Sequence, residues 1–102
     1  MEIIKLTTEL IGDELCDAEK YAKLANHWKE ECPDAAKIFN DLANAEIDHH
    51  AKLHDLVVKL ISKARAEKGA PSAEMKAVYD YLHGKNMEKA AAVMAYIKLY
   101  NM

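Results

Sequence analysis

The feature that most restricts the fold of this chain is a helical pattern of apolar residues that continues unbroken from Pro33 to about Glu67. Along this segment apolar side chains recur every three or four residues, which is the spacing of the stripe that an amphipathic helix turns toward a core. The members of the predicted core stripe are Ile38, Phe39, Leu42, His49, Leu53, Leu56 and Leu60. The pattern therefore predicts one long helix in the middle of the chain.

Turn-forming residues divide the rest of the chain into two further helices. Pro33 suits the first turn of a helix, where its missing N–H is not needed, and Gly69 is a typical C-terminal cap. Ser72 can cap the next helix, and Gly84, although unfavourable inside a helix, does not interrupt the apolar phase on either side of it. The predicted helices cover residues 3–30, 33–67 and 73–100, and no segment alternates like a strand. We predict an all-α fold.

The connections determine how these helices pack. The loop near Glu31-Cys32 is so short that the first two helices must be antiparallel neighbours, and a second loop near Gly69-Pro71 leads into the third. We expect a bundle of three long antiparallel helices. The residues predicted to be buried include Ala18, Ala22, Leu42, Leu53, Leu56 and Leu60. The apolar phase of the third helix is carried by Tyr79, Met87, Ala90, Met94 and Ile97.

Composition limits the classes of function. The 102 residues suffice for one domain, spanning 1–102, and carry a net charge of −3. Basic residues are dispersed among acidic ones, which argues against nucleic-acid binding. No apolar run approaches the roughly 18 residues that cross a bilayer and the N-terminus lacks a signal-peptide profile, so we expect a cytoplasmic protein with no membrane association. Cys16 and Cys32 lie about 24 Å apart along a helix, which is too far for a disulfide.

One motif in the long helix points to chemistry. Glu46 and His49 are three residues apart, which places a carboxylate and an imidazole one turn apart on the same helix face. On an apolar face such a carboxylate needs a proton, a counter-charge or a metal ion. Glu14 lies beside the apolar stripe of the first helix and is the predicted partner, whereas Glu19 has Lys23 as an ordinary ion-pair partner on the solvated side. A Glu plus a Glu-x-x-His is half the ligand set of a dinuclear iron or manganese site in a helix bundle.

The same residues resemble a known family. The segment from Ile11 to Leu53 resembles the first helical pair of the ferritin-like superfamily, and within it the rubrerythrin branch. The matching residues are Glu14, Tyr21, Ala22, Phe39, Glu46, His49, His50 and Ala51. The resemblance implies a ferritin-like bundle in which Glu14, Glu46 and His49 bind iron in a di-iron carboxylate centre, with manganese or zinc as alternative metals. The chain departs from the family pattern because it has no second Glu-x-x-His and no four-cysteine rubredoxin-type iron site.

The missing half of the ligand set predicts assembly. Two copies related by a two-fold axis would together supply four carboxylates and two imidazoles, which is a complete site near the axis. We therefore expect a homodimer or a higher even oligomer with the first two helices at the interface. Short members of the superfamily, the encapsulated ferritins, resemble this arrangement. The function that the resemblance implies is iron binding and oxidation or peroxide detoxification, by chemistry of the ferroxidase or peroxidase type.

Other interpretations of these residues stay open. Glu46 and His49 also fit a structural ion pair, and the whole chain fits a metal-free helical interaction module on a ferritin-like fold. His50 and His54 have the i,i+4 spacing of a zinc-binding pair, but they also fit the flank between core and solvent. His83 fits a hydrogen-bonded core or interface histidine.

Overall fold

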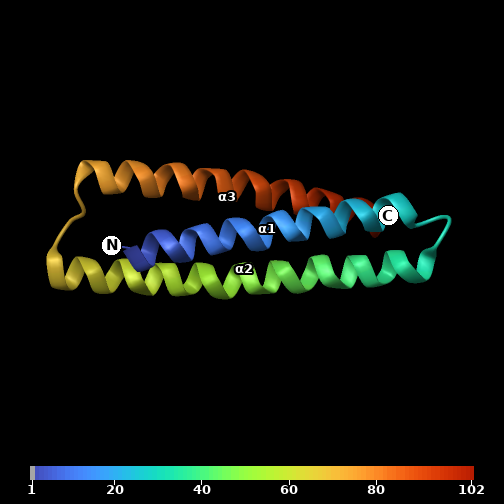
Figure 1. The fold of residues 1–102 in the computed structure, drawn as a ribbon, viewed down its shortest axis with the longest axis horizontal. Helices are drawn as coiled ribbons and strands as arrows, with labels where there is room; N and C mark the ends of the chain where they lie inside the picture. The colour runs from blue at the N-terminus through green and yellow to red at the C-terminus, as the bar shows by residue number, and fades with distance from the viewer. Residues whose placement is uncertain (1) are drawn as a thin grey trace.

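The computed structural model describes residues 2–102 as three long helices: α1 (Glu2–Trp28), α2 (Pro33–Lys68) and α3 (Ala73–Tyr100). They form an elongated bundle of 55 × 19 × 19 Å, in which the chain reverses direction at each end (Figure 1). No strand occurs in the described part of the chain. The predicted all-α fold of three antiparallel helices is confirmed, and α2 runs without a break between Phe39 and Leu60.

The helix ends follow from local chemistry. Pro33 occupies the first turn of α2, and Asp34 places a negative charge at the positive end of the helix dipole. Gly69 closes α2 with a φ of 79°, a left-handed conformation that suits glycine, and its N–H donates to the Arg65 carbonyl. Ser72 caps α3 because its Oγ accepts a hydrogen bond of 3.2 Å from the Met75 N–H.

Helix α1 is the central element of the bundle. It packs along both α2 and α3, whereas α2 and α3 make few contacts with each other. The packing core uses small side chains, which let the helix backbones approach closely. The fully buried residues of α1 and α2 are Leu15, Ala18, Ala22, Ala25, Ala36, Ala43 and Val57. Burial of Ala18 and Ala22 is therefore confirmed.

The leucine stripe of α2 is not its buried face, which corrects the predicted core. The exposed fraction is 59% for Ile38, 39% for Leu42 and 42% for Leu56, and Leu53 and Leu60 are only partly buried. The prediction that Leu42 and Leu56 are buried is wrong. The buried face lies about 100° around the helix, on Ala43 and Val57. Periodicity detects both stripes, and α1 packs against the one with smaller side chains because that face allows closer contact.

Helix α3 follows its predicted stripe at Ile97, which is buried, and at Tyr79 and Ala90, which pack against the core, but departs from it at the two methionines. Its buried residues are Asn86, Val93 and Ile97, while Met87 and Met94 are exposed. Burial of Asn86 is tolerated because its amide Nδ2 donates a hydrogen bond of 3.1 Å to the Thr8 carbonyl on α1. A polar residue therefore takes part in the buried α1–α3 contact, while Met87 and Met94 remain exposed.

Two remaining expectations concern the cysteines and the membrane. Cys16 and Cys32 are both free and exposed. Within residues 2–102, none of the helices has a segment long and apolar enough to cross a bilayer.

The glycines provide a test of the helix assignments. Gly84 lies inside α3, and an added Cβ would meet nothing within 4 Å. Gly84→Ala is therefore expected to raise the free energy of unfolding by about 1 kcal/mol, the difference in helix propensity. Gly69→Ala, at a positive φ, is expected to lower it by about 1 kcal/mol. Urea unfolding followed by circular dichroism measures both, and a destabilising Gly84→Ala would contradict a continuous α3.

Candidate metal centre

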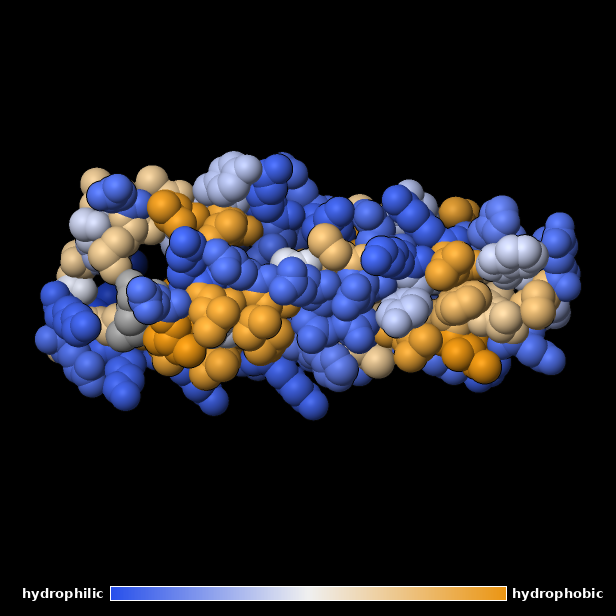
Figure 2. Space-filling model, viewed as in Figure 1, coloured by the Kyte–Doolittle hydropathy of each residue, from blue (hydrophilic) through white to orange (hydrophobic). Residues whose placement is uncertain are grey.

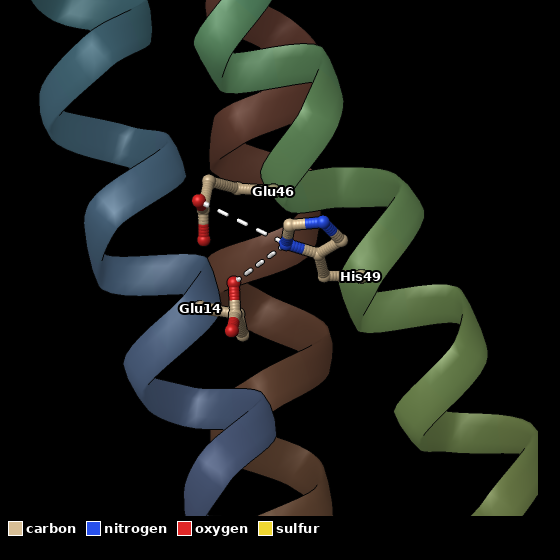
Figure 3. A group of neighbouring side chains, drawn as sticks. All are labelled: Glu14, Glu46 and His49. Carbon is tan, nitrogen blue, oxygen red and sulfur yellow. Dashed lines mark hydrogen bonds and ion pairs between the residues drawn. The ribbon is translucent and has the colours of Figure 1, made fainter.

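The structure brings Glu14, Glu46 and His49 together. Glu14 lies near the middle of α1, and the other two residues lie near the middle of the facing α2. Figure 3 shows the three side chains converging between the two helices, with α3 behind them. Each residue offers one ligand atom, and these three atoms lie within 4.8 Å of one another. The site therefore faces away from α3, on the side of the α1–α2 pair that α3 does not cover.

The distances between the ligand atoms suit a single ion. Nδ1 of His49 is 3.3 Å from Oε2 of Glu14 and 3.9 Å from Oε1 of Glu46. Two ligands of one transition-metal ion lie about 3 to 3.5 Å apart, because each bond is about 2.1 Å long. Small side-chain rotations would therefore bring all three atoms to coordination distance.

The site lies at the surface of the bundle. The side chains are 18% exposed for Glu46, 30% for Glu14 and 51% for His49. The prediction that Glu46 and His49 lie on the core face of α2 is wrong, because that face carries Ala43 and Val57. Their convergence, however, follows the sequence prediction. Glu46 is the most shielded of the three, and any charge on it is the most costly to leave uncompensated.

Contact with Glu14 makes Glu46 hold its proton more tightly than a free carboxyl group does. A hydrogen bond with Glu14, then partial burial, and then the negative charge of Glu14 raise the pKa of Glu46 from 4.5 to about 7, against the opposing effect of His49. When no cation is near, ionising both carboxyl groups costs free energy, because the two negative charges repel each other. Neither carboxylate pairs with a lysine or arginine among the described residues. The two acids therefore form a place where a bound cation would be stabilised.

The environment of Glu19 differs from the predicted solvated position. Glu19 pairs with Lys23 at 3.5 Å, as expected, but it also pairs with Lys89 of α3 at 3.3 Å and is only 21% exposed. It is therefore a link between α1 and α3 and not a solvated residue. The sequence pattern could not show this pair, because Lys89 is far away along the chain.

Sequence reasoning also missed Asp17. Its negative charge contributes to the raised pKa of Glu46, so Asp17 lies near the site. The available signal was its position three residues after Glu14, which places both acids on one side of α1. The acidic character of the site is therefore greater than the three ligand residues alone indicate.

The other histidines of α2 point elsewhere. His50 is half-buried, and its pKa is lowered by burial and then by the neighbouring His54 and His83. The ring of His54 stacks on that of His83 at a centroid distance of 5.8 Å. These three residues form a group between α2 and α3, separate from the Glu14–Glu46–His49 site.

Hydrophobic surface lies on either side of the metal-ligand candidates. Figure 2 shows two hydrophobic areas over α1 and α2, separated by a hydrophilic middle. The exposed large hydrophobic residues of these two helices are Ile3, Leu6, Leu10, Leu24, Trp28, Ile38, Leu42, Leu56 and Val58. His49 lies midway between Leu42 and Leu56, seven residues from each, so the three residues share one face of α2. The candidate site thus lies in the middle of an apolar face that no helix of this chain covers.

A helix bundle that carries a glutamate from one helix and a Glu-x-x-His from the next has the features of a ferritin-like protein. The family model described as Rubrerythrin matches residues 9–101, so the chain belongs to the rubrerythrin family. The match extends through α3, beyond the first helical pair that carried the resemblance in the sequence. No curated protein and no solved structure shows significant similarity to the chain.

Proposed function

We propose that this protein binds iron in a di-iron carboxylate site shared by two copies of the chain, and that it acts in iron oxidation or peroxide detoxification. Manganese is the alternative metal. The observation that carries the proposal is the convergence of Glu14, Glu46 and His49. Membership of the rubrerythrin family supports the same metal chemistry.

The donor set fits a divalent first-row metal. Carboxylate oxygens suit iron and manganese, and an imidazole adds affinity for iron. The raised pKa of Glu46 reflects negative charge that no cation compensates, and a bound metal ion would supply that charge in place of the proton. Glu46 is the most shielded of the three side chains, with 18% exposed, so its charge is the one that most needs a bound cation.

A second copy supplies what the single chain lacks. One chain offers two carboxylates and one imidazole, and two copies around a two-fold axis would double this set. Exposed apolar side chains of α1 and α2 lie on either side of the site, and a second copy placed around such an axis would cover them. Burial of Leu42 and Leu56 against the partner would contribute roughly 25 cal/mol for each Å² of apolar surface removed from water. A second copy of the chain would therefore both complete the ligand set and cover the exposed apolar surface.

The residues of this chain have distinct parts in such a site. Bound iron would supply the redox chemistry with dioxygen or peroxide. Glu14 and Glu46 would neutralise the charge of the ions, and the proton of Glu46 would leave as the metal enters. His49 would bind through Nδ1, the atom that already faces both carboxylates. Because a protonated imidazole cannot bind metal, affinity should fall with acidification.

An oxidation assay tests the proposal. Adding Fe²⁺ in air to the wild-type protein is expected to produce a near-ultraviolet ferric band within the protein fraction. Glu46→Gln is expected to abolish this band, because a neutral amide cannot replace the negative charge of the carboxylate ligand. Stopped-flow absorbance, with Fe²⁺ in buffer as the blank, measures the reaction.

The matched control is Glu31→Gln, an exposed acid in the loop after α1. It is expected to react like the wild type. If the wild type binds neither Fe²⁺ nor Mn²⁺ under anaerobic conditions, the metal site is excluded, and a metal-free helical interaction module becomes the better interpretation of the fold.

A further inference from the structure

Three histidines occupy the junction between α2 and α3. His50 and His54 are one turn apart on α2, with ring centroids 6.3 Å apart, and His83 reaches them from α3. The His83 ring also stacks on Tyr79, with a centroid distance of 5.5 Å. All four side chains are half-buried. The rings form one continuous row between two helices that otherwise make few contacts.

A histidine that is buried for structural reasons normally has a hydrogen-bond partner, but these three histidines have none in the part of the chain that the structure describes. In the described chain, none of the three imidazoles forms a hydrogen bond or an ion pair with another residue; His49 alone does so among the histidines of α2. The Nδ1 atom of His50 is buried and has no hydrogen-bond partner. A buried polar atom without a partner is uncommon and calls for an explanation. The row therefore contains ring nitrogens with free capacity to bind a ligand.

We propose that His50, His54 and His83 form a second metal site, which takes one imidazole-preferring divalent ion such as Zn²⁺. Histidines at i and i+4 on one helix can bind a single ion, and a third imidazole from a neighbouring element completes the three-histidine set found in zinc proteins. The site is chemically distinct from the Glu14–Glu46–His49 cluster. It offers only neutral nitrogen ligands, which suit zinc, copper and nickel, whereas the carboxylates suit iron and manganese.

Binding requires the rings to turn. The three histidines are not among the groups whose ligand atoms lie within 4.8 Å of one another in residues 2–102. His54 and His83 are stacked with an interplanar angle of 26°, so their nitrogens do not yet converge. Rotation of these half-buried side chains would exchange ring stacking for coordination and would separate His83 from Tyr79. The bound ion would then tie α2 to α3 where their contacts are few.

Calorimetric titration with Zn²⁺ tests this site independently of the iron site. The background is the double variant Glu14→Gln/Glu46→Gln, which disables the carboxylate cluster. We expect this protein to bind one Zn²⁺ per chain. Adding His83→Gln is expected to weaken binding by more than about a hundredfold, since loss of a supporting group alone costs about 10- to 100-fold. Adding His27→Gln, at the exposed end of α1, is expected to change nothing.

A second measurement leaves His50, His54 and His83 unsubstituted. Co²⁺ added to the same double variant is expected to shift the imidazole proton resonances of His50, His54 and His83 far more than those of His27. Two results would overturn the proposal: equal Zn²⁺ affinity with and without His83→Gln in folded protein, or no selective Co²⁺ shifts. Equal affinity would mean that Zn²⁺ binds to residues of α2 without His83. Neither result bears on iron binding by Glu14, Glu46 and His49.

Discussion

Replacing Glu46 with glutamine is expected to abolish metal binding and, at the same time, to stabilise the metal-free protein at alkaline pH. Contact with Glu14 and partial burial raise the pKa of Glu46 to about 7 in the folded state, from 4.5. The folded protein therefore holds this proton more tightly than the unfolded chain. The stability from this group is fully present below pH 4.5 and is lost as the pH rises through about 7.

Glutamine mimics the protonated acid at every pH. Glu46→Gln is thus expected to raise the free energy of unfolding by on the order of 1–3 kcal/mol at pH 8 and to change it little at pH 4.5 or below. Urea unfolding in the presence of a chelator, at pH 4.5 and pH 8, measures the difference. With Fe²⁺ or Mn²⁺ under anaerobic conditions the wild type should gain stability at pH 8, by about 2.7 kcal/mol at a metal concentration one hundred times the Kd, and the variant should gain none.

Glu19→Gln is the control, and it is expected to lower the free energy of unfolding where Glu46→Gln raises it. Glu19 pairs with Lys23 and Lys89 and has no acidic partner, so its loss should destabilise the protein at pH 8. A structural role for Glu46 and His49 predicts a different outcome for Glu46→Gln: a loss of about 3–5 kcal/mol, because a partner would be left unpaired. That loss, with no metal-induced rise in the melting temperature of the wild type, would exclude the proposed metal site.

The second large effect is expected from a charge on the apolar face of α2. The proposed dimer buries Leu42 and Leu56, which are 39% and 42% exposed in the single chain. Leu42→Glu/Leu56→Glu is expected to convert the dimer to a monomer, because desolvating two carboxylates in an apolar interface is costly. The iron-oxidation band should be lost with it, since each chain would hold only half of the ligand set.

Light scattering coupled to gel filtration, together with the absorbance assay, measures both effects. Met94→Glu is the matched control: Met94 is also apolar and 53% exposed, but it lies on α3, away from the site. It should remain dimeric and active. A wild-type protein that is monomeric at all concentrations would contradict the shared site and leave at most a mononuclear one.

The members of the candidate site were predictable from the sequence. Glu46 and His49 are related by the period of a helix, and that period is a property of the backbone alone. Glu14 followed from its position beside the stripe of α1 and from the resemblance to the rubrerythrin pattern. The role of Asp17 and the pairing of Glu19 with Lys89 did not follow, because they depend on how helices are rotated against each other.

The sequence by itself determined the number, length and ends of the helices, because Pro33, Gly69 and Ser72 act on the backbone within a few residues. It also determined which side chains share a face of one helix. Only the tertiary structure decided which face of α2 is buried. Leucine and alanine stripes have the same period, and α1 packs against Ala43 and Val57 because small side chains allow closer contact. That choice left Leu42 and Leu56 exposed on either side of His49, and the same packing places His83 beside His54 across two helices.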